Sequence, residues 1–143
     1  MHEGIIMEQV TLKGSCLCHA VQYEVSGEPK HFYHCHCSRC RKSTGTGHAT
    51  NLMMVNAKLA FTNGESLVRE FKVPDAKRFA RQFCGQCGSP VPRYVPEAGF
   101  VIIPAGSLDD GVPIKPQARI FWDSCADWSC DGDALPRFAE YPG

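Results

Sequence analysis

The grouping of the cysteines constrains the fold of this sequence more than any other feature. Seven of the nine cysteines fall in three short groups, Cys16-x-Cys18, Cys35-x-Cys37-x-x-Cys40 and Cys84-x-x-Cys87. Three short-spaced groups in one short chain are typical of metal sites. Met1–Gly14 has no apolar targeting segment, and cytosolic thiols are kept reduced. We therefore expect a cytoplasmic protein whose grouped cysteines bind zinc rather than form disulfides.

The pair in Cys84-Gly85-Gln86-Cys87-Gly88 is the strongest local signal. A C-x-x-C turn directs two sulfurs at one point, and Gly88 permits the positive φ that lets backbone N–H groups face them. Such a turn supplies half of a tetrahedral site. The other half must come from Cys16 and Cys18, or from part of the group at positions 35, 37 and 40.

The seven grouped cysteines are enough for one site with four protein ligands and a second site with three. If Cys16 and Cys18 complete the first site, the group at 35, 37 and 40 forms a second site with three protein ligands. Four protein ligands make a structural site, whereas three leave a position for water or substrate. Cysteines two apart on a regular strand have Cα atoms about 6.5 Å apart. Each C-x-C must therefore sit at a bend if both sulfurs bind one zinc.

The other cysteines and the histidines are expected to have different roles. Cys125 and Cys130 are interpreted as lone thiols rather than ligands, with a disulfide between them as the alternative. His34 and His36 alternate with Cys35 and Cys37, so on extended backbone they would point away from the sulfurs. We expect supporting or packing roles for both. His48 is a candidate proton donor, although a surface or core position is favoured.

The strand pattern predicts an all-β protein. The 13 glycines and 10 prolines divide the chain into short segments. Leu17–Val25 alternates as a strand, with Leu17 on the face of Val21, Tyr23 and Val25. Lys58–Val73 predicts a hairpin with Asn63-Gly64 as its turn, and helix is confined to a short turn after Cys37. Further strand candidates are Phe32–Cys37, Ala49–Val55, Arg78–Phe83, Val91–Val95, Phe100–Pro104 and Ala118–Trp122.

Composition limits the partners. Fifteen basic and fifteen acidic residues give no net charge, which disfavours nucleic acid as a partner of the whole surface. The basic stretch Arg69–Arg81 is read either as a solvated face or as a rim that attracts a small anionic substrate. No segment approaches the length of a membrane span. We expect one domain over residues 1–143, and a homodimer is left open.

Three thiolates on zinc leave a net negative charge, which weakens the metal as an acid towards water. Zinc accepts a further soft thiolate readily. The open site, Cys35, Cys37 and Cys40, is therefore suited to capturing a substrate thiol or polarising a small carbonyl. Arg39, Arg41 and Lys42 flank this group. Arg41 and Lys42 are the candidates for binding anionic groups of the substrate.

The motifs, taken in order, resemble the glutathione-dependent formaldehyde-activating enzyme family, which includes proteins similar to centromere protein V. They are GSCLCHAVQYEV, HCHCSRCRKSTGTGHATN, FCGQCGSPV, PAGSLDD, IFWDS and ALPRF, spanning about residues 14–138. The resemblance implies an Mss4-like all-β fold of folded sheets. It also implies two zinc ions per chain: a structural one on Cys16, Cys18, Cys84 and Cys87, and a catalytic one on Cys35, Cys37 and Cys40. An open three-thiolate site is easily oxidised or stripped, so the catalytic zinc is the one that could be labile. His19 stands where the family usually has glycine, which predicts a different loop geometry there.

The function that follows is a carbon–sulfur lyase-type enzyme resembling S-(hydroxymethyl)glutathione synthase. It would act on a small thiol, glutathione or similar, and a small carbonyl at the three-cysteine zinc. One alternative is a non-catalytic zinc module that binds a protein or nucleic acid through Arg69–Arg81. Another is a redox sensor in which oxidation of the exposed cysteine group ejects the metal.

Overall fold

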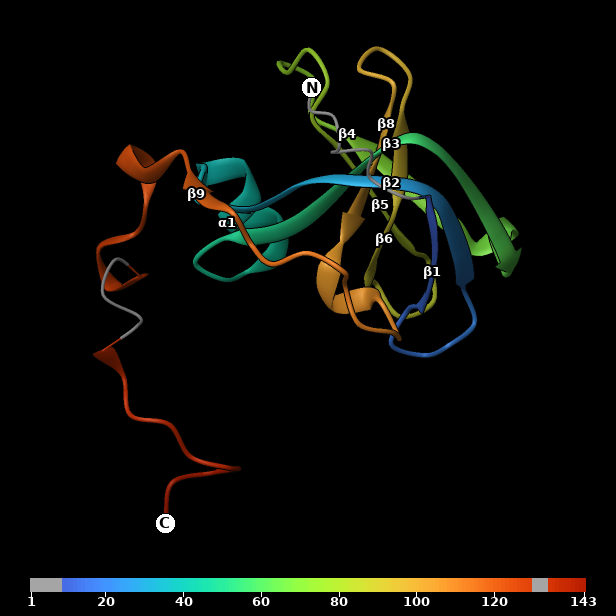
Figure 1. The fold of residues 1–143 in the computed structure, drawn as a ribbon. Coiled ribbons are helices and arrows are strands. Elements are labelled where there is room, and N and C mark those ends of the chain that lie inside the picture. Colours follow the sequence, from blue (N-terminus) through green and yellow to red (C-terminus); the bar gives the residue numbers. More distant parts are fainter. Residues whose placement is uncertain (1–8, 130–133) are drawn as a thin grey trace, which may run out of the picture.

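The computed structural model describes residues 9–129 and 134–143, and β-strands dominate this part of the chain (Figure 1). One short α-helix, α1 (Ser38–Thr44), follows Cys37, which confirms the all-β prediction with its single helical turn. No helix in these ranges is long and apolar enough to cross a membrane. The strands are β1 (Val10–Ser15), β2 (Gln22–Cys35), β3 (Ala49–Asn63), β4 (Val68–Lys72), β5 (Ala80–Cys84), β6 (Pro90–Val91), β7 (Arg93–Val95), β8 (Phe100–Pro104) and β9 (Ala118–Ile120).

The strands form two sheets. The larger has the order β1-β2-β3-β8-β7, with β9 added parallel to β2, and the smaller has the order β4-β5-β6. The two longest strands, β2 and β3, pair antiparallel through several register shifts. Cys35 is the last residue of β2, and the Cys16–Cys18 turn lies between β1 and β2. The long β2 strand therefore has a cysteine group at each of its ends.

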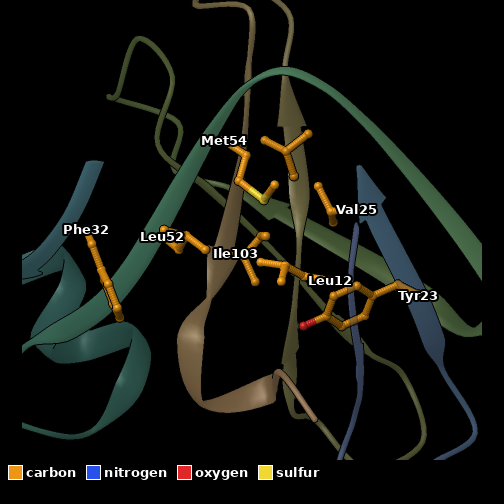
Figure 2. Close-up of a cluster of buried hydrophobic side chains, with 8 residues drawn as sticks. Leu12, Tyr23, Val25, Phe32, Leu52, Met54 and Ile103 are labelled. Atoms are coloured by element: carbon orange, nitrogen blue, oxygen red, sulfur yellow. The ribbon is translucent and has the colours of Figure 1, made fainter. Parts of the chain in front are cut away.

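The core lies on one face of the six-stranded sheet (Figure 2). Alternate residues of each strand point to the same face, so Leu52 and Met54 of β3 join Val101 and Ile103 of β8 in it, and each of these four side chains is fully buried. Burying a side chain of this size contributes roughly 1.5–3 kcal/mol. Leu12, Tyr23, Val25 and Phe32 from β1 and β2 complete the cluster.

The hairpin predicted over Lys58–Val73 is wrong. Strand β3 ends at Asn63, but β4 pairs with β5 in the smaller sheet and not with β3. At the turn Gly64 has a φ of 73°, and a 3-10 turn, η2 (Glu65–Leu67), follows it. The Asn63 side chain donates to the Ala20 carbonyl oxygen at 2.9 Å. These contacts fasten the turn to the β1–β2 loop and direct the chain into the second sheet.

Several other strand predictions are correct only in part. Tyr23 and Val25 are buried as expected, whereas Leu17 is 79% exposed, because the residues before β2 form the turn that carries Cys16 and Cys18. The candidate Val91–Val95 divides into β6 and β7, which belong to different sheets. Pro92 lies between them, and its missing N–H cannot continue a strand ladder.

Candidate metal centres

The four-cysteine centre brings the two sheets together. Cys16 and Cys18 come from the turn between β1 and β2, and Cys84 and Cys87 from the turn between β5 and β6. Their sulfurs all lie within 4.8 Å of one another. The Cys18 sulfur is 3.6 Å from that of Cys16 and 3.9 Å from that of Cys84. A tetrahedral zinc with Zn–S bonds of about 2.3 Å needs sulfurs about 3.8 Å apart, so this donor set fits zinc.

Backbone N–H groups support the charge on these sulfurs. The Gln86 N–H donates to the Cys84 sulfur and the Val21 N–H to the Cys16 sulfur, each at 3.3 Å. The φ of Gly88 is 78°, as the C-x-x-C-G pattern predicts. The Ser89 hydroxyl beside Cys87 lowers the pKa of that thiol to about 5. Donors aimed at sulfur favour the thiolate, which is the form that binds metal.

His19 occupies the turn of this centre with a φ of 65°. Its own N–H donates to the Cys16 carbonyl at 3.0 Å. The loop therefore has a left-handed conformation that favours glycine at this position, and the predicted difference from the family's loop stays a prediction. The histidine adopts this conformation at a conformational cost.

The three-cysteine centre lies where β2 runs into α1. Cys35 ends β2, Cys37 caps the helix, and Cys40 lies in its first turn. The Cys37 sulfur accepts the Cys40 N–H at 3.3 Å, and the three sulfurs lie within 4.8 Å of one another. The chain bends between Cys35 and Cys37, as a shared ion requires. Within residues 9–129 and 134–143, no further His, Cys, Asp or Glu side chain joins this group.

Proton sharing within this group favours a thiolate. The hydrogen bond from Cys40 lowers the pKa of Cys35 to about 6, from an ordinary value of 9.0. The same bond raises the pKa of Cys40, and burial raises it further. This shift favours the thiolate form of Cys35, which is the form that binds a soft cation.

A cavity of about 580 Å³ opens over the three-cysteine centre, and all three cysteines line it. Three arginines line it as well: Arg39 from α1, Arg78 from the segment before β5, and Arg93 from β7. The Arg93 side chain donates to the Arg78 carbonyl oxygen at 3.1 Å, which fixes its position at the cavity. The volume lies within the usual range for sites that bind small molecules.

The structure places the predicted anion-binding residues elsewhere. Arg41 and Lys42 do not line this cavity; Lys42 faces a smaller groove of about 380 Å³ beside Phe71. Sequence reasoning did not find Arg93 at all. The sequence shows Arg93 only as a single charged residue in a short, mostly apolar strand. The face of the sheet that it occupies follows from the pairing of β7 with β8.

Three histidines, His34, His36 and His48, form a packed cluster next in sequence to Cys35 and Cys37 and to the start of β3. The rings of His34 and His48 stack with centroids 4.2 Å apart. The His36 ring is buried 5.0 Å from His48 and 5.0 Å from Trp122, and burial lowers its pKa. His48 approaches the Thr50 hydroxyl at 3.1 Å. This agrees with the packing roles expected for His34 and His36.

The basic stretch Arg69–Arg81 divides between the cavity, which Arg78 lines, and hydrogen bonds to backbone carbonyls. In the basic stretch, Arg69 donates to the Ser66 carbonyl and Lys72 to the Ala76 carbonyl, each at 2.8 Å, and Arg81 donates to the Ser43 carbonyl. Cys125 is disulfide-bonded, so the alternative to a lone thiol holds for this residue. Cys130 lies outside the described residues.

Comparison with known proteins places this geometry in a family. Residues 11–124 match the family described as glutathione-dependent formaldehyde-activating enzyme. The chain belongs to this family. A relative from Halomonas elongata, named "Putative glutathione-dependent formaldehyde-activating enzyme", is 30% identical over 123 residues, which cover 82% of this chain and 78% of the relative. The matched part of this member of the glutathione-dependent formaldehyde-activating enzyme family contains both cysteine centres and the whole lining of the cavity.

A solved structure supports the fold. The crystal structure of a Rhodobacter sphaeroides protein superposes with a TM-score of 0.57 at 19% sequence identity. The match covers 76% of this chain and 99% of that protein. At this identity the likeness concerns the arrangement of the strands alone.

Proposed function

We propose that this member of the glutathione-dependent formaldehyde-activating enzyme family is a zinc-dependent carbon–sulfur lyase-type enzyme. It joins a small thiol, glutathione or similar, and a small carbonyl, as S-(hydroxymethyl)glutathione synthase does. The observation that carries the proposal is that Cys35, Cys37 and Cys40 all line one cavity of about 580 Å³ together with three arginines. The sulfur of a thiol substrate could bind at the cysteine centre while its anionic groups bind the arginines.

Two zinc ions per chain follow from the donor sets. With zinc bound, the four-cysteine centre would be closed and structural, whereas the three-cysteine centre would have one position left for a molecule in the cavity that its cysteines line. A zinc ion bound there would supply a soft Lewis acid that lowers the pKa of a substrate thiol. Cys35, Cys37 and Cys40 are the catalytic residues in this proposal, because they would meet the reacting sulfur through the metal they hold.

The rest of the cavity binds and orients the substrate. Arg39, Arg78 and Arg93 are suited to paired hydrogen bonds with carboxylates, and glutathione carries two carboxylates. The described residues that line the cavity include no His, Asp or Glu. Addition of a thiol to a carbonyl moves the thiol proton to the carbonyl oxygen, and with no His, Asp or Glu in the lining we propose that this proton passes through solvent. Positioning is therefore the main contribution of the protein.

Arg41 and Lys42 remain proposed anion partners at the end of α1, where they would act at longer range than the cavity arginines. Replacing Arg93 with Gln should raise KM for glutathione at least tenfold, because a charge-assisted bond is lost. Arg41→Gln and Lys42→Gln should each raise it less than threefold. A larger effect at position 41 or 42 than at 93 would show that the thiol binds outside the cavity.

The decisive experiment uses the zinc-loaded chain with glutathione and formaldehyde. We expect two zinc ions per chain by metal analysis and faster formation of S-hydroxymethylglutathione than without protein, followed by NMR exchange spectroscopy. Cys37→Ser should retain one zinc and its circular dichroism spectrum but lose both the acceleration and glutathione binding. A zinc-loaded wild type that neither binds glutathione nor accelerates the exchange would refute the proposal and favour the non-catalytic zinc module.

A further inference from the structure

The outward face of the six-stranded sheet is apolar beside the three-cysteine centre, although it is not part of the core. In β8, Val101 and Ile103 are fully buried in the core, so Ile102 between them points to the opposite face. The same alternation in β3 directs Met53 away from the core. An antiparallel sheet normally carries polar side chains on the face that it exposes to water. Here Met53 and Ile102 are half-buried and line the cavity over the three-cysteine centre instead.

The strand register joins these side chains into a continuous patch. Met53 lies opposite Ile102 and Ile102 opposite Arg93, while Phe100 lies opposite Val95 in the next row. Pairing of β9 with β2 places Ile120 opposite Cys35, which brings the patch to the cysteine centre. The apolar wall of the cavity consists of Met53, Val95, Phe100, Ile102, Ile120 and Phe121, together with Phe79 from the segment before β5.

Neither formaldehyde nor the polar backbone of glutathione covers such a wall. In small-molecule sites, apolar walls contact apolar parts of the ligand, and a few polar groups fix its orientation. Here Arg39, Arg78 and Arg93 provide those polar groups within the same cavity. The cavity thus combines an anion-binding part, a thiol-binding centre and an apolar wall, and the first two are accounted for by a carboxylate-bearing thiol.

We propose that the apolar wall binds the side chain of the carbonyl substrate, so that this enzyme joins its thiol to alkyl or aryl aldehydes larger than formaldehyde. This rests on the proposed function. The sulfur–carbon bond forms as the carbonyl π bond opens, and the proton of the thiol ends on the carbonyl oxygen. The product is a hemithioacetal, and nothing is oxidised or reduced. Met53, Phe100 and Ile102 then determine specificity for the aldehyde.

Binding of two unreactive probes to the zinc-loaded chain tests the wall. S-hexylglutathione and S-methylglutathione differ only in their apolar chain, and each buried methylene raises affinity about fourfold. We expect calorimetry to give at least about tenfold tighter binding of the hexyl probe. Ile102→Asn should reduce that ratio to near one. Tyr94→Ser, an exposed β7 position outside the cavity lining, should leave the ratio unchanged.

Turnover provides the second measurement. The kcat/KM for hexanal with glutathione should exceed that for formaldehyde, and Ile102→Asn should reverse this order. Equal binding of the two probes, binding of neither, or a ratio unaffected by Ile102→Asn would each overturn the proposal. The proposal would also be overturned if the chain formed a dimer that buries this face and bound both probes with the same affinity. If formaldehyde turnover proceeds without a chain-length preference, only this inference fails; if no thiol binds at all, the proposed function fails.

Discussion

His19 shows how a single residue can be kept in an unfavourable backbone conformation. It adopts a φ of 65° in the turn between Cys16 and Val21. For a residue with a Cβ, the left-handed region costs roughly 1–2 kcal/mol relative to glycine. The turn must bring two sulfurs to one ion, and this requirement overrides the local preference.

Replacing His19 with Gly should therefore stabilise the zinc-loaded protein, by about 1 kcal/mol. The measurement is the midpoint of urea unfolding in the presence of zinc. Lys13→Gly provides a control of opposite sign, because Lys13 lies in extended backbone of β1 and glycine there weakens the strand. Destabilisation by His19→Gly would mean that the imidazole makes a contact worth more than the strain.

Gly64 and Gly99 form a matched pair with φ values of 73° and 72°. A Cβ on Gly99 would meet nothing within 4 Å, whereas a Cβ on Gly64 would collide with the Ala20 carbonyl oxygen. Gly99→Ala should cost about 1–2 kcal/mol from backbone strain alone. Gly64→Ala should cost at least about 1 kcal/mol more, as measured by chemical denaturation. Equal costs would show that the β1–β2 loop moves aside freely.

At the residue level, the cysteine groups could be predicted because ligands of one metal site that lie close together in the sequence can be recognised from their spacing. The structure gathers Cys16 and Cys18 with Cys84 and Cys87, and leaves the other three together, which is the division reached by counting. Arg93 could not be predicted in the same way. Its place in the cavity depends on the pairing of β7 with β8, and that pairing is a long-range property.

At the level of elements, β8 separates two roles along five residues. Ile103 is fully buried in the core, while Ile102 lines the cavity. In a strand with one polar face, alternating apolar and polar residues show which face is buried. Phe100–Pro104 is apolar throughout and shows no such alternation. The sequence therefore predicted the strand with its correct bounds without revealing which face packs and which face binds.

Alanine substitutions at these neighbours should separate the two roles. Ile103→Ala should destabilise the fold by about 2–5 kcal/mol, as truncations in a packed core do. Ile102→Ala should cost clearly less, about 1 kcal/mol, because its side chain is only half-buried. Urea unfolding of both variants in zinc provides the comparison. Similar losses would indicate that the outward face also packs against protein.

The Lys58–Val73 prediction failed at this same level for a physical reason. Asn-Gly followed by alternating residues is a strong hairpin signal. Here the Asn63 side chain is bonded to Ala20, and β4 finds its partner in β5. A local turn signal specifies that the chain turns, but the partner of the next strand depends on the second sheet.

In the whole molecule, the four-cysteine centre is the junction between the sheets. Cys18 lies on the side of the larger sheet and Cys84 on that of the smaller, with sulfurs 3.9 Å apart. Metal binding at such a site is coupled directly to folding, with apparent free energies of about 10–16 kcal/mol in small zinc domains. The three-cysteine centre lies within one stretch of chain, at the end of β2 and the start of α1, and joins no two sheets.

Matched serine substitutions should distinguish the centres. Cys18→Ser should lower the melting temperature strongly or prevent folding, because it opens the junction between the sheets. Cys37→Ser should leave the melting temperature within a few degrees while removing one zinc. Calorimetry together with metal analysis on both variants makes the comparison. Equal losses of stability would contradict the division into a structural and a functional centre.

The two turns that form the four-cysteine centre lie far apart in the sequence, and this affects the chain during its synthesis. Cys18 and Cys84 are 66 residues apart in sequence, so at about 5–20 residues per second the ribosome delivers the second turn roughly 3–13 s after the first. During that interval the first pair of thiols has no partner from the later turn. Oxidants should therefore damage newly made chains far more readily than finished, metal-loaded ones, and the supply of zinc during synthesis should determine the yield of folded protein.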